Sequence, residues 1–357
     1  MEKKVHWETT LGRLELSVQR FLDGQKLVTP FSCSAKVNCR DYSLLLERVI
    51  TDFGADTSFG QVVEKLREHY EITISATAVQ NITKKHARAC YDMIEKTADL
   101  PGGKESRCLI GELDGAMIPV VLFEPNEHPD KRKWRKTGWK EARLSVAREK
   151  GSLTKIFLAT LGSTDRAGEL LGRCAKRLGW ASKTKIHCLG DGARWIYEQV
   201  EKVFGTQGNY LIDFFHLSEY LAGASATCCK GAPKEWLKAR QEEMKENRIE
   251  EVLKTLKSHV ESEGIKDENA PVRKCIRYME NRLGQFQYKE AILEELPIGS
   301  GEIESGNRSV VQKRLKIPGA WWSTDTAEHM MALRCVRING DWMKYWKTVS
   351  SSFARAA

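Results

Sequence analysis

Residues 185–216 read KIHCLGDGARWIYEQVEKVFGTQGNYLIDFFH, and this stretch decides the fold. Its apolar run KIHCLG predicts a buried strand, residues 193–203 have the apolar spacing of a helix, and NYLIDFFH predicts a second strand. A strand, a helix and another strand in this order are typical of a sheet with helices packed on its faces.

Extended patterns precede this stretch. The segments RCLIGELD, AMIPVVLFEP, ARLSVA and KIFLATLG predict three or four antiparallel strands between residues 107 and 162, and residues 164–178 predict a helix. Residues 217–296 have an almost wholly helical pattern, and a new helix is expected to begin near Ser300 after a Gly-rich break. We therefore expect an α+β or α/β protein with a mixed sheet flanked by helices and interrupted by an all-helical insertion.

A separate helical unit is expected near the N-terminus. Ser58 and Ser75 can each cap a helix, and the second helix would carry amide and basic side chains on its polar side. A helix-turn-helix presents its reading helix to DNA in this way, although an ordinary helical hairpin has the same pattern. The predicted DNA-reading side chains are Gln80, Asn81, Lys84, Lys85 and Arg88.

These patterns divide the chain into four consecutive blocks. They are residues 1–100 with the DNA-binding unit at about 58–97, residues 101–216 with the first part of the sheet domain, residues 217–296 with the helical insertion, and residues 297–357 with the last part of the sheet domain and a basic tail. The sequence LPGG at 100–103 marks the first boundary. Residues 1–50 carry no clear pattern.

The positive charge of the chain is unevenly spread. It has 57 Lys and Arg against 48 Asp and Glu, and the excess gathers at residues 131–150 and 305–357, which also contain tryptophans. Cations beside indole rings suit a polyanion such as nucleic acid, although a solvated basic face over buried tryptophans gives the same composition. The predicted phosphate contacts are Lys131, Arg132, Lys133, Arg135, Lys136, Lys313, Arg314 and Lys316.

Composition excludes several classes of protein. A chain of 357 residues with 41% hydrophobic and 29% charged residues is neither disordered nor collagen-like. The apolar run Met117–Phe123 is too short to cross a bilayer and the charged start MEKKVHWE lacks a secretory signal, so we expect a cytoplasmic protein that joins the nucleoid when bound to DNA. The ten cysteines contain no CxxC pair and are interpreted as reduced core thiols, with a structural zinc site as the alternative.

Three acidic residues stand where structural roles explain them poorly. Asp114 and Asp191 each follow an apolar run and precede a glycine, so both are expected at strand ends, while Glu304 falls in the first turn of the helix near Ser300. Arg308 and Gln312 would follow Glu304 on the same helix face. Singly, each acid is explained by turn capping or surface exposure.

Converging carboxylates repel each other unless a cation joins them, so the three acids predict a divalent metal site. Oxygen ligands favour Mg²⁺ or Mn²⁺ over zinc. Two such ions, roughly 3.5 to 4 Å apart, activate a hydroxyl and stabilise the leaving oxygen in phosphodiester chemistry.

Four separated blocks carry a family resemblance. LDGAMIPV, LGDGARWI, LIDFFHLSEYL and PIGSGEIESGNRSVVQKRLKIPGAWWS resemble the signature blocks of bacterial insertion-sequence transposases with an Asp-Asp-Glu triad, in particular the Kra-type group and its Mutator-like relatives. The resemblance covers residues 31–337 and implies a catalytic core folded like ribonuclease H. It implies Asp114, Asp191 and Glu304 as catalytic, metal-binding acids, with Glu302 as the competitor for the third position.

The resemblance also implies an Asp-x-x-His element, here Asp213 and His216. An aspartate at a strand end can orient the imidazole three residues on, so we expect His216 to contact the DNA backbone or to hold the catalytic carboxylates rather than to bind metal. The alternative is a hydrogen-bonded core histidine. Arg308 would support the same site. Three tryptophans are candidates for stacking on a displaced base or for packing against the sheet: Trp195, Trp321 and Trp322.

The expected function is that of a DNA transposase, a polynucleotidyl transferase with two-metal chemistry. It would bind the double-stranded ends of its own element, hydrolyse a phosphodiester there and join the freed 3′-hydroxyl to target DNA, acting as a homo-oligomer on DNA. Two alternatives remain open: a catalytically inactive or repurposed DNA-binding protein, and a metal-dependent nuclease that cuts without joining. A carboxylate-pair glycosidase suits the strong basic patches poorly.

Overall fold

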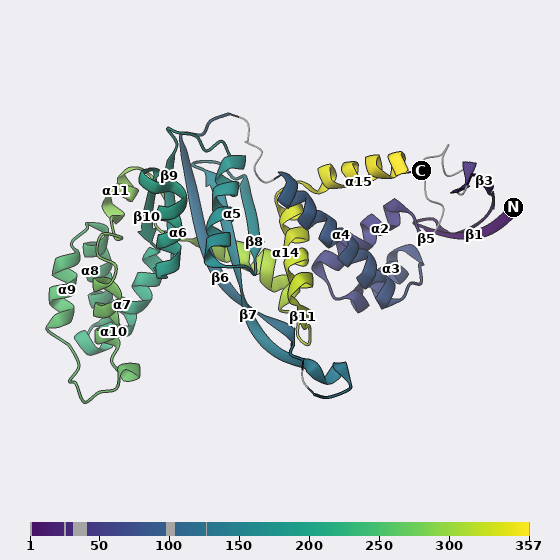
Figure 1. Cartoon of the computed structure of the whole chain (residues 1–357). Coiled ribbons are helices and arrows are strands. Elements are labelled where there is room, and N and C mark those ends of the chain that lie inside the picture. The colour runs from purple at the N-terminus through teal and green to yellow at the C-terminus, as the bar shows by residue number, and fades with distance from the viewer. Residues whose placement is uncertain (1, 25, 31–40, 98–103, 126, 357) are drawn as a thin grey trace. The chain divides into compact units, whose positions relative to one another are not determined.

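The structure, a computed structural model, describes residues 2–24, 26–30, 41–97, 104–125 and 127–356. The chain forms two compact units built from alternating segments (Figure 1). Unit 1 consists of residues 1–98, 116–142 and 308–357, and unit 2 consists of residues 99–115 and 143–307. The units therefore interleave along the chain, whereas the sequence patterns suggested consecutive blocks.

A mixed sheet has the strands β6 (Cys108–Phe123), β7 (Arg135–Glu149), β8 (Lys155–Thr160), β9 (Lys185–Gly190) and β10 (Gly208–Ile212), in the spatial order β10-β9-β6-β7-β8. Unit 2 contains β8, β9 and β10 with residues 108–115 of β6 and 143–149 of β7, and the rest of β6 and β7 belongs to unit 1. β6, β9 and β10 pair in parallel, and β7 pairs with β8 in antiparallel fashion. The predicted mixed sheet flanked by helices is confirmed.

The strand β6 corrects one expectation. RCLIGELD and AMIPVVLFEP were expected as two strands that a turn at Gly115 separates, but residues 108–123 form one continuous strand. Buried residues continue on both sides of Gly115, including Leu113, Ala116 and Ile118, so the sequence has no exposed break there that would favour a turn. Asp114 consequently lies within β6 and not at its end.

Two helices cover the sheet of unit 2 as predicted. α5 (Thr164–Arg177) begins at Ser163, whose side chain caps it by accepting a hydrogen bond from the amide of Arg166. α6 (Arg194–Phe204) follows β9 directly. α5 packs on β8 and on α6, and α6 packs on β9 and β10.

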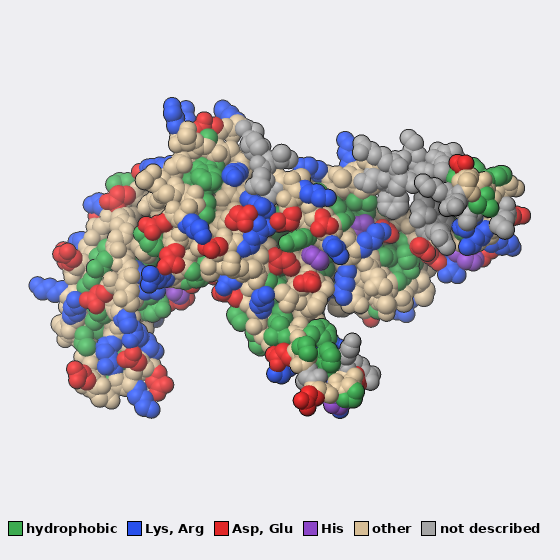
Figure 2. Space-filling view, in the orientation of Figure 1, with side chains coloured by type: hydrophobic (Ala, Val, Ile, Leu, Met, Phe, Trp, Pro, Cys, Tyr) green, Lys and Arg blue, Asp and Glu red, His purple; other side chains and the backbone are tan. Residues whose placement is uncertain are grey.

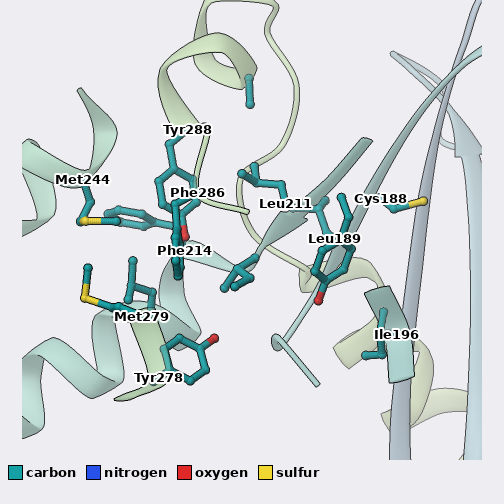
Figure 3. Close-up of a cluster of buried hydrophobic side chains, with 14 of the residues drawn as sticks. Cys188, Leu189, Ile196, Leu211, Phe214, Met244, Tyr278, Met279, Phe286 and Tyr288 are labelled. Atoms are coloured by element: carbon teal, nitrogen blue, oxygen red, sulfur yellow. The ribbon is translucent and has the colours of Figure 1, made fainter. Parts of the chain in front are cut away.

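The helical block expected over residues 217–296 is confirmed. Its helices are α7 (Phe214–Cys228), α8 (Pro233–Lys245), α9 (Ile249–Lys257), α10 (Pro271–Glu280) and α11 (Tyr288–Leu293). The block shares one core with the sheet, because Leu189 and Leu211 of the strands belong to the same cluster as Phe214, Met279 and Tyr288 (Figure 3). This continuous core gives unit 2 a single hydrophobic interior.

Unit 1 is built from strands and helices distant in sequence. Its complete elements are β1 (Glu2–Thr9), β2 (Gly12–Gln19), β3 (Phe21–Asp23), β4 (Lys26–Val28), β5 (Asp41–Tyr42), α2 (Leu44–Asp56), α3 (Phe59–Tyr70), α4 (Ala76–Thr97), α13 (Lys313–Leu315), β11 (Trp322–Ser323), α14 (Thr324–Ile338) and α15 (Trp342–Ala356). The first strands fall in the region where the sequence showed no clear pattern. Their alternation is weak because most of their side chains are exposed or half-buried.

The predicted helix pair is confirmed as α3 and α4. Ser58 forms a capping box with Gln61, and the Ser75 hydroxyl accepts a hydrogen bond from the Ala78 amide at 3.1 Å. α2, α3 and α4 share a hydrophobic core that includes Leu46, Leu66 and Val79. The other buried side chains of this core are Ile50, Val62, Ile72, Ile74 and Ile82. α14 also packs against α4. The pair is therefore part of a larger helical assembly.

Two further expectations concern membranes and cysteines. Among the described helices, we find none that combines the length and the apolar character needed to cross a bilayer. The eight cysteines within the described ranges are free, and six of them are buried. Cys33 and Cys39 lie outside the described residues.

Candidate active site

Asp191 lies directly after β9, as predicted. The chain turns at Gly192, whose φ of +86° favours glycine. A Cβ atom at Gly192 would also come within 2.7 Å of the Tyr278 hydroxyl oxygen, so no larger residue fits there without a shift. The close approach of α10 and the turn after β9 therefore requires this glycine.

The turn that carries Asp191 is held by side chains from the helical block. The Tyr278 hydroxyl donates to the Asp191 carbonyl oxygen at 2.8 Å, and Arg282 Nε donates to the Gly192 carbonyl oxygen at 2.7 Å. Asp191 Oδ1 itself accepts a hydrogen bond from the Ala193 amide at 2.8 Å. The Arg282 guanidinium also lies 4.2 Å from the centre of the Tyr278 ring. No local pattern predicts these contacts, because the residues that they join lie about ninety positions apart in the chain.

Asp114 and Asp191 occupy equivalent places on neighbouring parallel strands. The pairing of β6 with β9 runs from Cys108 opposite Lys185 to Glu112 opposite Leu189. Asp114 and Asp191 each lie two residues beyond the last pair of this ladder, Glu112 and Leu189. Both aspartates therefore follow the same end of the β6–β9 ladder.

Glu112 shares the face of Asp114 but is deeply buried. Only 1% of it is exposed, and its Oε2 atom accepts a hydrogen bond from the Ile303 amide at 2.7 Å. Burial raises the pKa of this carboxyl to about 8, although the Ile303 amide opposes the shift. Glu112 is therefore largely uncharged at neutral pH. We did not predict it, since its position in an apolar run resembles that of any core residue.

Asp213 joins three elements of unit 2. Its Oδ1 atom caps α7 by accepting hydrogen bonds from the amides of Phe215 at 2.6 Å and His216 at 3.0 Å. Its Oδ2 atom accepts from the Ser300 amide at 2.6 Å and from the Ser300 hydroxyl. The expectation that Asp213 orients the imidazole of His216 is corrected, because the aspartate bonds the backbone of that residue.

Ser300 precedes α12 (Gly301–Gly306), the short helix that carries both candidate third acids. Glu302 is half-buried and forms ion pairs with Lys155 and with Arg148, whose Nε atom lies 3.5 Å from the carboxylate. Glu304 is exposed. The two cations beside Glu302 give it a structural role in unit 2.

A π-helical segment, η4 (Asn307–Gln312), follows α12. It interrupts the α-helical spacing on which the expected shared face of Glu304, Arg308 and Gln312 was based. Instead, Asn307 Nδ2 donates to Asp114 Oδ2 at 2.5 Å. Asn307 is only 3% exposed, and its Oδ1 atom has no hydrogen-bond partner within the described part of the chain. Arg308 is exposed and belongs to unit 1.

His216 lies in an aromatic cluster of the helical block. Its ring centre is 5.5 Å from that of Tyr220 and 5.8 Å from that of Tyr278, and the two tyrosines stack at 4.0 Å. His216 Nδ1 is 3.6 Å from Glu219 Oε2. Through Tyr278, this cluster reaches the turn that carries Asp191. Trp195 is half-buried on α6, with the Arg143 guanidinium 5.6 Å from its ring centre.

The predicted metal ligands are not gathered as a ready cluster. Within the described ranges, no group of three His, Cys, Asp or Glu side chains has the spacing to hold an ion. Asp114 and Asp191 follow the same end of the β6–β9 ladder, and Asn307, directly after α12, bonds Asp114.

The predicted DNA-reading side chains of α4 fall into two groups. Asn81, Lys85 and Arg88 are exposed, and Lys85 Nζ forms an ion pair with Glu47 of α2 at 2.9 Å. Gln80 and Lys84 are half-buried and line a pocket of unit 1.

The predicted phosphate contacts are mostly exposed. The exposed ones are Lys133, Arg135, Lys136, Lys313 and Lys316, while the side chains of Lys131 and Arg132 lie outside those that the structure describes. Lys136 pairs with Glu124, and Lys313 Nζ lies 3.7 Å from Asp56. Arg314 departs from the expectation, because it is only 2% exposed and its Nε atom donates to the Gly54 carbonyl oxygen at 2.9 Å.

Comparison with protein families gives a match to part of the chain. A family model described as an uncharacterised protein family, UPF0236, matches residues 174–350. The matched segment includes Asp191 and Glu304 and begins after Asp114. None of the curated proteins matches the chain.

Proposed function

We propose that this chain is a DNA transposase of an insertion sequence, with a ribonuclease H-like catalytic core in unit 2. It would bind the ends of its element, hydrolyse a phosphodiester and transfer the freed 3′-hydroxyl to target DNA. The resemblance of four sequence blocks to Asp-Asp-Glu transposases supports this proposal, as does the mixed sheet with helices on its faces.

One observation carries the proposal. Asp114 and Asp191 follow the same end of the β6–β9 ladder, and Asn307, directly after α12, donates a hydrogen bond to Asp114. Glu304 lies in α12, three residues before Asn307 in the chain. Three acids from distant parts of the sequence thus belong to neighbouring elements of one unit.

The donor chemistry suits Mg²⁺ or Mn²⁺. All three candidate ligands are carboxylates, and the amide oxygen of Asn307 is a further buried oxygen beside Asp114. Two ions held by Asp114, Asp191 and Glu304 would activate the attacking hydroxyl and stabilise the leaving oxygen. Three carboxylates repel one another, so we expect them to close together only as cations bind.

The surrounding residues have positioning roles. Tyr278 holds the carbonyl oxygen of Asp191, and Arg282 holds that of Gly192. Asn307 holds one carboxylate oxygen of Asp114. Asp213 ties the start of α12 to α7, which holds the helix that carries Glu304. The neutral state of Glu112 keeps a further negative charge away from the acids.

DNA would meet unit 1 through its exposed cations. The start of β7 offers Arg135 and Lys136, and α4 offers Asn81 and Arg88. Cations supply affinity for phosphates, while an amide on a helix is able to read a base edge. Joining two element ends requires two active sites, so the working form would be a homo-oligomer on DNA.

The decisive experiment compares strand breakage by wild-type protein and by Asp191→Asn. Each is incubated with a plasmid carrying the flanks native to the gene and Mg²⁺ or Mn²⁺, and broken and joined strands are mapped. Asp165→Asn is the matched control, since this exposed aspartate of α5 pairs with Lys202 at 2.8 Å. We expect cuts at element ends and joined products with wild type and Asp165→Asn, and none with Asp191→Asn.

Other outcomes identify the alternatives. Metal-dependent cuts without joined products would indicate a nuclease. Binding to the flanks without breakage, by a protein that melts cooperatively, would indicate a repurposed DNA-binding protein. Normal cleavage by Asp191→Asn would contradict the assignment of the catalytic acids.

A further inference from the structure

Unit 1 contains a pocket of about 340 Å³ that the catalytic proposal does not use. Its walls come from the starts of α3 and α4 and from the segment between α13 and α14. The lining side chains that could meet a ligand are Gln80, Lys84, Arg314 and Trp321. The lining includes no aspartate or glutamate, so the pocket is positive in character.

Arg314 lines this pocket and is a buried cation, only 2% exposed. Its guanidinium lies between two aromatic rings, 4.7 Å from the centre of Phe59 and 4.8 Å from that of Trp322. Its Nη2 atom is buried and makes no hydrogen bond to any described residue. Burial lowers the pKa of Arg314 to about 10, which leaves it charged at neutral pH. A buried cationic donor without a partner is stabilised when an anion enters.

The tryptophans of the pocket have different roles. Trp322 is buried, donates from Nε1 to the Leu315 carbonyl oxygen at 3.2 Å and packs against Phe59. Trp321 is 44% exposed, and its ring centre lies 6.4 Å from that of Trp139, which is 61% exposed. Trp322 therefore holds the wall, and Trp321 offers an open indole face at the rim.

We propose that this pocket binds one unpaired nucleotide of DNA, with its phosphate between Lys84 and Arg314 and its base stacked on Trp321. The proposal rests on the proposed function for its choice of DNA, but not on the catalytic acids. Nucleotides combine an anion with an aromatic ring, and the pocket offers cations and an indole within one hollow. Gln80 adds an amide that can bond the edge of an unpaired base.

The charge of the wall favours a nucleotide over a second copy of this chain. A protein surface that filled the pocket would leave the Nη2 atom of Arg314 without a hydrogen-bond acceptor unless it inserted one. A paired duplex could reach Lys84 by its phosphates, but it could not stack on Trp321 because its base faces are already covered. The distinguishing property is therefore a preference for unpaired nucleotides.

The test is fluorescence anisotropy of the full chain in EDTA with two labelled DNA hairpins, each closed by a non-nucleotide linker so that the loop contains no unpaired nucleotides. One hairpin is blunt, and the other carries a single unpaired 3′ thymidine. We expect wild type to prefer the overhang, and Trp321→Ala and Lys84→Gln to weaken overhang binding about tenfold while changing blunt binding less than twofold. Trp321→Phe should retain most of the preference. Arg67→Gln, which removes an exposed charge of α3, is the matched control and should change neither the affinity for the overhang hairpin nor that for the blunt hairpin.

Three results would overturn the proposal. The first is equal affinity of wild type for both hairpins. The second is a Trp321→Ala variant that loses affinity for the blunt hairpin as much as for the overhang hairpin. The third is a Trp321→Ala variant that loses self-association without any change in DNA binding. Thermal melting identifies variants that fail to fold, and Trp321→Gln then replaces Trp321→Ala, with the same loss of overhang binding as its expected result. Because the assay needs neither metal nor cleavage, the pocket can bind as proposed even if no strand breakage is found.

Discussion

At the scale of single residues, Asn307 shows how a buried amide can serve a carboxylate. Its Nδ2 atom bonds Asp114, while its Oδ1 atom is buried and makes no hydrogen bond to the described residues. Leaving a buried acceptor unpaired costs about 1–3 kcal/mol, so such an atom is uncommon unless a ligand completes its bonding. Asn307 is therefore expected to matter more for activity than for folding.

The variant Asn307→Ala should cleave element ends roughly 10- to 100-fold more slowly than wild type, the usual effect of removing a residue that orients a metal ligand. It should also need more Mg²⁺ to reach half of its maximal rate. Both are measured by strand cleavage across a Mg²⁺ titration, and Asn269→Ala, an exposed site in unit 2, is the control. An unchanged Mg²⁺ midpoint in a folded Asn307→Ala would exclude a role for Asn307 at the metal site.

A second residue-scale prediction concerns Asp56 at the end of α2. Burial alone would raise the pKa of this carboxyl, but hydrogen bonds and ion pairs with Arg334 at 2.7 Å and Arg337 at 2.9 Å lower it below its ordinary value. A lowered folded-state pKa stabilises the protein above the unfolded-state pKa, and this stability is lost as the pH falls through the folded-state pKa.

Asp56→Asn should therefore lower the free energy of unfolding by roughly 2 kcal/mol at pH 7, and this difference should shrink below about pH 4. Urea unfolding from pH 3 to pH 7 measures it. Asp52→Asn is a milder comparison, because Asp52 is exposed in its side chain and pairs only with Arg337. A difference between wild type and Asp56→Asn that stays constant across this range would show that the ion pairs contribute nothing.

At the scale of elements, one aspartate fixes the mutual positions of β10, α7 and α12. Asp213 follows β10, caps α7 and accepts two hydrogen bonds from Ser300 at the start of α12. Because α12 is only six residues long, its own backbone hydrogen bonds cannot hold it in place. The anchoring at Ser300 and the bond from Ile303 to Glu112 do so instead.

Replacing Asp213 by Ala should lower the free energy of unfolding by roughly 3 kcal/mol, since it removes a helix cap and leaves buried donors unpaired. Ser163→Ala, which removes a single capping bond from α5, should cost only about 1 kcal/mol. Chemical denaturation of both variants gives the comparison. Equal losses would mean that the bonds to Ser300 add no stability.

The sequence allowed prediction of those elements that local patterns define. α5 and α6 have strong apolar periodicity, and Ser163, Ser58 and Ser75 mark helix starts by their own hydrogen bonds. The length of β6 was not predictable, because Gly115 is as common in a turn as in a strand. The π-helical segment was also missed, since its hydrogen bonding depends on packing that no local pattern reports.

The candidate site was predicted only in part for the same reason. Asp191 follows from a strand pattern and a glycine turn, whereas Glu112, Tyr278 and Arg282 become recognisable only when distant segments meet. Arg314 was predicted from a basic segment as a surface cation, but it is buried. A run of basic residues does not reveal which of them points inward.

At the scale of the whole molecule, the two units are each completed by segments that lie far apart in the chain. α4 packs against α14, although more than two hundred residues separate them, and His86 of α4 bonds Tyr345 of α15 at 2.6 Å. The N-terminal helices therefore lack a large part of their packing when α14 and α15 are removed.

A fragment of residues 1–100 should consequently bind a dye for exposed apolar surface and melt without a sharp transition. By contrast, unit 2 made as residues 104–115 joined to 143–307 by an Asn-Gly turn should unfold cooperatively, because its core is complete within those segments. Calorimetry compares the two. Cooperative melting of the first fragment would show that α14 is dispensable for the N-terminal helices.

The interleaving also sets an order of events during synthesis on the ribosome. Every segment of unit 2 has emerged once residue 307 has left the exit tunnel, while α14 and α15 of unit 1 are still to be made. The nascent N-terminal helices must wait for them with one apolar face uncovered. A message interrupted between the codons for residue 307 and α15 would yield a complete unit 2 attached to an incomplete unit 1. Chaperones and proteases would act on such a product.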